Sequence, residues 1–224
     1  GGHNGQLHNG VARSCLAQFI DRSETLSTLL DDPRILGVAT SLLGEDFNYM
    51  GSDGNYYVGD TTWHEGILHI KIAFYQDSLT DQTGCLRVIP GSHRPGDSYA
   101  SALSKQVSKS QELWGMEGAE IPAVAFETQP GDVVCFNHNI KHATFGGTRR
   151  RMFTMNCCQR YPEDRLEELR NSISGGARFW VERGYGESMI HIADEKRMRH
   201  LEQKLTNDGH LAELSRQSRL NMTE

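Results

Sequence analysis

The sequence predicts a mainly β fold, a sandwich or barrel with helices packed against it. Short segments rich in β-branched and aromatic residues recur at close intervals between about residues 47 and 160. Turn signals such as Pro90-Gly91 and Pro130-Gly131-Asp132 separate these segments. Segments with helical spacing flank the strand region on both sides, which favours a β sandwich or barrel.

The N-terminal part, residues 11–44, is predicted to be helical. Asp32 is a suitable N-cap, and Pro33 occupies the first helical position, where a missing N–H costs nothing. An apolar face follows, and Gly44 is placed to end this helix. A shorter helix is predicted at about residues 23–30.

The strand region begins at about residue 47. Residues 67–75 form the clearest strand, because the segment combines β-branched and aromatic side chains. A polar insertion at about 99–114 is predicted to be helical. The other strands are predicted at 47–50, 56–58, 85–89, 123–127, 133–137 and 152–158, the first two being joined by a turn at Ser52-Asp53-Gly54.

The C-terminal part, residues 162–224, is predicted to be helical and is highly charged. We expect residues 1–224 to form a single domain whose core is 47–160. The C-terminal helices are expected either to cover one mouth of the barrel or to form a dimer contact, and the sequence does not choose between the two.

The composition excludes some partners. A net charge of −6 argues against binding to a nucleic-acid duplex, which prefers a basic face. The chain has no run of about 18 apolar residues and no signal-peptide pattern, so we expect a cytoplasmic protein without a membrane span. The five cysteines include no CxxC pair and are expected to be reduced thiols, most of them in the core. Because the sequence starts without methionine, we expect residues before Gly1 to be missing.

Four segments of the chain resemble the phytanoyl-CoA dioxygenase family, in the order that the family has them. They are Gly59–His64, the turn Gly84–His93, the strand start Pro130–Val134 with His142 after it, and Arg150–Phe153. The resemblance implies a double-stranded β-helix, which is a cupin-like jelly roll. It also implies an enzyme that uses Fe(II), 2-oxoglutarate and O2.

The resemblance assigns the metal ligands and the cosubstrate clamp. His64 and His142 would bind the iron, which in such sites takes two imidazoles and one carboxylate. Arg150 would hold the distal carboxylate of 2-oxoglutarate as a bidentate clamp, with Arg151 as the next choice and Arg149 as a third. A solvated or phosphate-binding patch is the alternative interpretation of this arginine run.

Two further histidines lie near these motifs. His138 precedes His142 by four residues, a ligand spacing on a helix, but the context here is a strand and a turn. We therefore expect His138 to order the site through hydrogen bonds. His93 is expected to shape the cofactor pocket.

The chain departs from the family pattern at the third ligand. The residue two positions after His64 is Gly66 instead of a carboxylate, and Glu65 should point away from the face that His64 uses. A glycine at this position resembles the iron(II), 2-oxoglutarate halogenases, in which chloride or bromide binds in place of the acid. Gly66 is thus the expected catalytic and halide-binding position of a chlorinase that acts on an aliphatic C–H bond.

Three other interpretations stay open. Glu65 binds iron after a local bulge, which would give an ordinary hydroxylase. A loop is missing between His64 and Ile67, a segment that is short for the family, and the alignment of Gly66 then changes. The third interpretation is a metal-free binding protein.

The substrate is the least defined part of the prediction. Lys71, Arg94 and the 149–151 run leave cations to spare after 2-oxoglutarate is held. A phosphorylated small molecule, such as a deoxynucleotide monophosphate, is therefore the preferred substrate. No residue is assigned to bind it.

Overall fold

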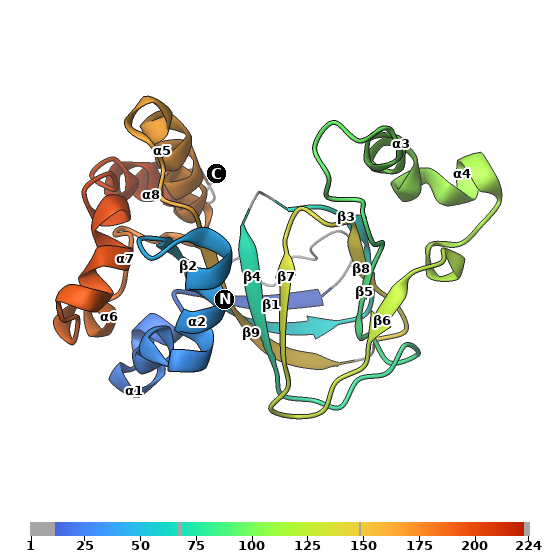
Figure 1. Ribbon diagram of the computed structural model, residues 1–224, viewed down its shortest axis with the longest axis horizontal. Coiled ribbons are helices and arrows are strands. Elements are labelled where there is room, and N and C mark those ends of the chain that lie inside the picture. The colour runs from blue at the N-terminus through green and yellow to red at the C-terminus, as the bar shows by residue number, and fades with distance from the viewer. Residues whose placement is uncertain (1–11, 67–68, 148, 222–224) are drawn as a thin grey trace. The chain divides into compact units, whose positions relative to one another are not determined.

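The computed structural model describes residues 12–66, 69–147 and 149–221 (Figure 1). The chain divides into two compact units. The first contains Cys15–Gly54 and Thr154–Glu224, and the second contains Asn55–Phe153. Each unit is described by itself below.

The strands form two sheets. The five-stranded sheet has the order β1-β2-β9-β4-β7, and the four-stranded sheet has the order β3-β8-β5-β6. Their bounds are β1 Ala12–Ala17, β2 Asn48–Val58, β3 Thr61–His64, β4 Ile70–Tyr75, β5 Leu86–Val88, β6 Val124–Phe126, β7 Val133–Asn137, β8 His142–Thr144 and β9 Arg150–Cys158. The α-helices are α1 Glu24–Ser27, α2 Pro33–Leu43, α3 Ser98–Gln106, α4 Ser110–Trp114, α5 Leu166–Ser174, α6 Glu187–His191, α7 Glu195–Leu205 and α8 Leu211–Leu220.

In the second unit the two sheets face each other, with β4 and β7 opposite β8, β5 and β6 (Figure 1). The pairs β4–β7, β3–β8, β5–β8 and β5–β6 are all antiparallel. Ala73, Tyr75, Leu79 and Cys85 form an inner cluster, which explains why the β4 segment is almost continuously apolar. This arrangement confirms the predicted double-stranded β-helix.

A second cluster covers the outer face of the four-stranded sheet. Trp63, Ala143 and Phe145 pack there with Leu103 of the helical insertion. Trp63 also donates its indole N–H to the Gly118 carbonyl at 2.8 Å. Because side chains alternate along a strand, this packing turns the residues next to Trp63 and Ala143 toward the inner face.

The first unit is held by a buried polar network around α7. The ammonium group of Lys204 donates to the carbonyls of Met50 (2.6 Å) and Gly184 (2.8 Å). Burial lowers the pKa of Lys204 to about 8, against the opposing effect of Asp21. Arg197, also on α7, pairs with Asp31. These contacts tie α7 to distant parts of the same unit.

Most predicted elements are confirmed, and two predictions are wrong. Within the segment predicted to be helical, Ala12–Ala17 is strand β1, in which Cys15 is buried and Leu16 is 40% exposed. Pairing at the edge of a sheet decides this segment, because alternating burial suits a strand and leaves a helix without an apolar stripe. The helices at 33–43 and 98–114 and the strand at 133–137 lie where the sequence predicts them.

The turn predicted at Ser52-Asp53-Gly54 does not form, because β2 runs through it from Asn48 to Val58. Ser52 is buried and accepts a hydrogen bond from the Ile20 amide at 3.0 Å. A Cβ at Gly54 would overlap the Phe19 ring. Ser52 and Gly54 are therefore explained by their tertiary contacts with Ile20 and Phe19, and not by a turn.

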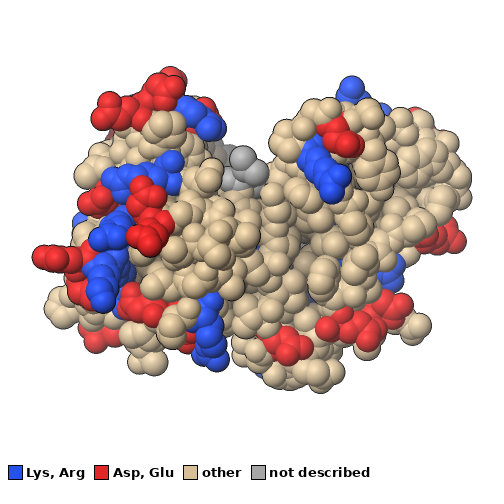
Figure 2. All heavy atoms as spheres, in the orientation of Figure 1, with Lys and Arg blue, Asp and Glu red and all other residues tan. Residues whose placement is uncertain are grey.

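The surface and the cysteines agree with the composition. Figure 2 shows acidic and basic side chains interspersed over the C-terminal helices, at the left of the view. None of the helices in the described ranges is long and apolar enough to cross a membrane. None of the five cysteines forms a disulfide, and Cys135 is the exposed one. Residues 67–68, which begin the strand predicted at 67–75, lie outside the described residues. The alternative of a missing loop between His64 and Ile67 concerns this same segment.

Candidate metal centre

His64 and His142 are cross-strand partners at the ends of β3 and β8. Their ring centroids are 4.1 Å apart, with an interplanar angle of 52°. Their chain neighbours Trp63 and Ala143 belong to the outer cluster, so both imidazoles are directed to the inner face. The structure therefore brings together two ligand candidates that lie far apart in the sequence.

Each of the two imidazoles is oriented by a carbonyl two residues earlier. His64 Nδ1 lies 2.8 Å from the Thr62 carbonyl oxygen, and His142 Nδ1 lies 2.7 Å from that of Ile140. A carbonyl only accepts, so we assign the proton to Nδ1 in both rings. Nε2 then carries the lone pair, which is the arrangement of a metal-binding histidine with an anchored second nitrogen.

The environment keeps the His142 and His138 rings neutral. Burial, and then the charge of His64, lowers the pKa of His142 to about 3. Burial also holds the pKa of His138 far below its usual value of 6.5. A neutral imidazole is the form that binds a metal, so no proton has to be displaced at neutral pH.

Gly66, at the expected third ligand position, lies against His138. The Gly66 amide donates to the His138 carbonyl at 2.9 Å. A Cβ at residue 66 would come closer than 3.0 Å to Nδ1, Cε1 and Nε2 of the His138 ring. That ring is also 5.2 Å from the His142 ring. His138 thus lies inside the site, and its hydrogen bond to Gly66 comes from its main chain.

The carboxylate of Glu65 is already engaged. It forms an ion pair with Lys141 at 3.0 Å and accepts a hydrogen bond from Ser104 at 2.8 Å. Lys141 is 5% exposed, and the Ser92 hydroxyl accepts its amide N–H at 2.8 Å. Sequence reasoning missed Lys141, Ser92 and Ser104. Opposite charges beside two paired histidines are the signal for the Glu65–Lys141 pair, once the strand pairing is known.

The residues present fit a metal site with two protein ligands. Among the described residues, no group of three His, Cys, Asp or Glu side chains is arranged to hold a metal ion. His64 and His142 supply two oriented nitrogens, and Gly66 supplies none. The remaining coordination positions would then belong to small molecules.

The three candidate arginines differ in their surroundings. Arg150, the first residue of β9, is 3% exposed, and its Nη1 donates to the Gly84 carbonyl at 2.7 Å. Gly84 has a φ of +98°, and a Cβ there would also collide with Gly147, so the motif needs glycine. Arg151 is on the surface, paired with Asp77 at 2.5 Å, and Arg149 is exposed. Burial therefore favours Arg150 as the clamp.

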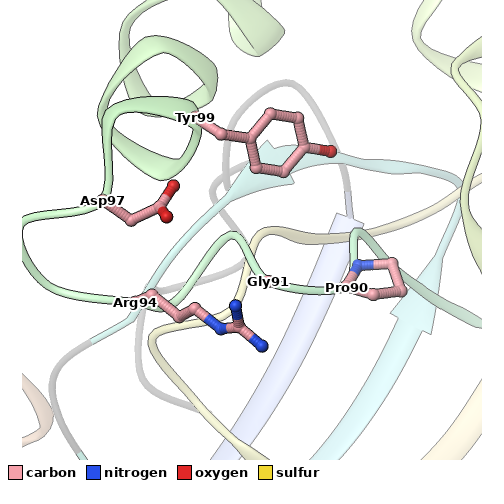
Figure 3. Close-up of a pocket in the computed structure, with 5 residues that line it drawn as sticks. All are labelled: Pro90, Gly91, Arg94, Asp97 and Tyr99. Atoms are coloured by element: carbon pink, nitrogen blue, oxygen red, sulfur yellow. The ribbon is translucent and has the colours of Figure 1, made fainter.

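A cavity of about 330 Å³ opens at the turn that contains His93 (Figure 3). Pro90, Gly91, Arg94, Asp97 and Tyr99 line it. Ile89, directly before this turn, donates its amide N–H to the carbonyl of Lys141 at 3.0 Å, and Lys141 directly precedes His142. The chain thus enters the Pro90–His93 turn from a residue that is hydrogen-bonded next to His142.

The two antiparallel sheets with an inner histidine pair define the fold class as a cupin-like jelly roll. The chain belongs to the phytanoyl-CoA dioxygenase (PhyH) family, whose model matches residues 9–152. Solved structures agree on the fold. HygX from Streptomyces hygroscopicus, with nickel and 2-oxoglutarate bound, has a TM-score of 0.56 and 13% identity, covering 69% of this chain and 73% of that one.

Two further structures have the same fold. The non-heme alpha ketoglutarate dependent epimerase SnoN from nogalamycin biosynthesis has a TM-score of 0.54 and 17% identity, covering 68% of this chain and 63% of that one. EvdMO1 has a TM-score of 0.50 and 17% identity over 66% of this chain. The matched part spans only 35% of the EvdMO1 chain. No curated protein matches the sequence.

Proposed function

We propose that the protein is an Fe(II)- and 2-oxoglutarate-dependent halogenase that chlorinates an aliphatic carbon of a small molecule. One observation carries the proposal. Gly66 stands where the family resemblance places a carboxylate, and the adjacent carboxylate of Glu65 is engaged by Lys141 and Ser104. A position without a protein ligand suits a halide.

The residues have separate parts in this proposal. His64 and His142 would hold iron through Nε2, and the buried Arg150 guanidinium would hold 2-oxoglutarate. Bound iron, with 2-oxoglutarate and O2, supplies the oxidising power to remove a hydrogen atom from an aliphatic carbon. The protein's own contribution is to hold these groups and to keep one coordination position open.

The overall reaction balances without another reductant. R–H, chloride, 2-oxoglutarate, O2 and a proton give R–Cl, succinate, CO2 and water. One oxygen atom of O2 enters succinate and the other leaves as water. A C–H bond is broken and a C–Cl bond is formed.

The charge around the site favours anions. Lys71 on β4 lies close enough to lower the pKa of His69, His138 and His142, in each case after burial. The positive charge of Lys71 beside these histidines would stabilise bound anions such as 2-oxoglutarate and a halide. Chloride or bromide would therefore meet a favourable potential.

We assign the substrate to the cavity beside the 90–99 turn. The Arg94 guanidinium and the Tyr99 ring border the same space (Figure 3). An arginine suits a phosphate, and a tyrosine ring suits a planar base. These residues support a phosphorylated substrate of the deoxynucleotide monophosphate type.

A hydroxylase is the second candidate. The Glu65 side chain is 39% exposed, and it is held by an ion pair with Lys141 and a hydrogen bond from Ser104. If Glu65 left them, its carboxylate would approach the iron from the residue next to His64. The substrate carbon would then gain a hydroxyl group whose oxygen comes from O2, the other oxygen atom entering succinate, and no halide would be consumed.

The test is an anaerobic titration of the protein with Fe(II), 2-oxoglutarate and chloride. We expect a visible iron–2-oxoglutarate absorption band that shifts when chloride or bromide is added. Incubation in air with deoxynucleotide monophosphates should then give a product with the chlorine isotope pattern in mass spectra. A halide-independent hydroxylated product would establish the hydroxylase, and a protein that binds no iron would leave only a binding role.

A further inference from the structure

Gly66 is not required by its backbone conformation. The positive-φ glycines of the described chain, such as Gly84, do not include it, so other residues could adopt its backbone angles. The reason for glycine at this position must therefore be space.

The His138 imidazole fills the space that a side chain at residue 66 would need. A Cβ at residue 66 would overlap three atoms of the His138 imidazole, at distances that real Cβ atoms do not show. The imidazole has little freedom to retreat. It stacks on the His69 ring with centroids 5.6 Å apart and an interplanar angle of 8°, and the Phe136 ring meets it edge-on at 6.3 Å.

The main chain fixes His138 from both sides. Its carbonyl accepts the Gly66 amide at 2.9 Å, and its own amide donates to the His69 carbonyl at 2.8 Å. These bonds set the separation between the Gly66 backbone and the His138 ring. The ring is thus a built-in neighbour of residue 66.

We propose that His138 is a positioning residue that keeps the third ligand position of the metal centre clear of any protein side chain. The proposal deepens the proposed function, because the halide position would be protected by an imidazole as well as by the absence of a carboxylate. Aspartate at residue 66 would then be excluded for as long as His138 holds its place.

The first experiment measures packing without metal. Urea unfolding in EDTA is compared for wild type, Gly66→Ala, His138→Ala and the double variant. Gly37→Ala is the matched control, because Gly37 lies in α2 with nothing within 4 Å of an added Cβ. We expect Gly66→Ala to lower the unfolding midpoint clearly, and the same change to have little effect when His138 is alanine. The control should not lower the midpoint. A Gly66→Ala variant as stable as the control, or equally destabilised in both backgrounds, would overturn the proposal.

The second experiment measures iron affinity under anaerobic conditions, by the iron–2-oxoglutarate absorption band. Gly66→Asp alone should bind iron no more tightly than wild type. Gly66→Asp with His138→Ala should bind about tenfold more tightly than Gly66→Asp, because the carboxylate can then reach the metal. Tighter binding by Gly66→Asp alone contradicts the proposal, as does loss of iron in His138→Ala. If wild type shows no band while the unfolding data couple Gly66 and His138, the proposed function fails and the steric role of His138 stands.

Discussion

The backbone orients the imidazoles of both His64 and His142. Each ring has its Nδ1 on a carbonyl two residues earlier, at 2.8 and 2.7 Å. We expect His64→Ala and His142→Ala to abolish the iron–2-oxoglutarate absorption band, because each removes one of two protein ligands. His138→Ala should keep it. If His142→Ala bound iron and His138→Ala did not, the ligand assignment would be wrong.

Arg150 and Arg151 form a natural pair of test and control. Arg150→Ala should weaken 2-oxoglutarate binding by about 2–4 kcal/mol, because a buried charge-assisted clamp loses one partner. Arg150→Lys should restore only part of the affinity, since an ammonium group cannot reproduce the guanidinium fork.

Arg151→Ala should leave 2-oxoglutarate binding unchanged, because this side chain pairs with Asp77 on the surface. Isothermal titration of 2-oxoglutarate into the metal-loaded variants measures both effects. A large loss in Arg151→Ala with none in Arg150→Ala would move the clamp by one residue.

The β3–β8 ladder separates chemistry from packing. Trp63 and Ala143 belong to the outer cluster. His64 and His142 adjoin them on the two antiparallel strands, and their side chains point to the inner face. One strand position further, Glu65 and Lys141 form their ion pair. A shift of one residue in the β3–β8 pairing would move the side chains of the shifted strand to the opposite face of the sheet. The two imidazoles would then no longer meet on the inner face.

This arrangement predicts the behaviour of Glu65→Gln. Iron affinity should not change, because Glu65 is held by Lys141 and Ser104. Stability in urea should fall by about 1 kcal/mol, since the buried lysine loses its counterion while the exposed side of the pair is screened by solvent. Loss of iron binding in Glu65→Gln would make Glu65 a ligand and favour the hydroxylase.

At the scale of the whole molecule, buried neutral imidazoles should make the metal-free protein sensitive to acid. Burial, and then Lys71, lowers the pKa of His69 to about 4, against 6.5 as its ordinary value. Between these values the unfolded chain takes up a proton that the folded chain does not. Stability therefore falls as the pH falls from 6.5 toward 4.

The prediction is measurable with a single variant. From pH 7 to pH 5, His69 should account for about 1–2 kcal/mol of lost stability. His69→Phe keeps a flat ring against His138 but cannot titrate, so its free energy of unfolding should depend less on pH. Urea unfolding in EDTA at the two pH values makes the comparison. An equal pH dependence in both proteins would contradict the role of His69.

The sequence alone determined the parts of the fold that depend on near neighbours. The N-cap at Asp32 with Pro33 after it, and the apolar segment at 133–137 that follows the Pro130-Gly131-Asp132 turn, are local signals, and the structure has both elements in place. The spaced motifs around His64 and His142 also predicted a jelly roll in which the two residues meet, which the pairing of β3 and β8 provides.

Only the tertiary structure decided what surrounds the third ligand position. Residue 66 is visible in the sequence as a missing carboxylate, but its neighbour His138 is far along the chain, and so is the Lys141 that engages Glu65. Tertiary contacts likewise made β1 a strand and carried β2 through a predicted turn. Such contacts follow from how distant strands pair and pack, and local propensity carries no information about which distant side chain will fill a given space.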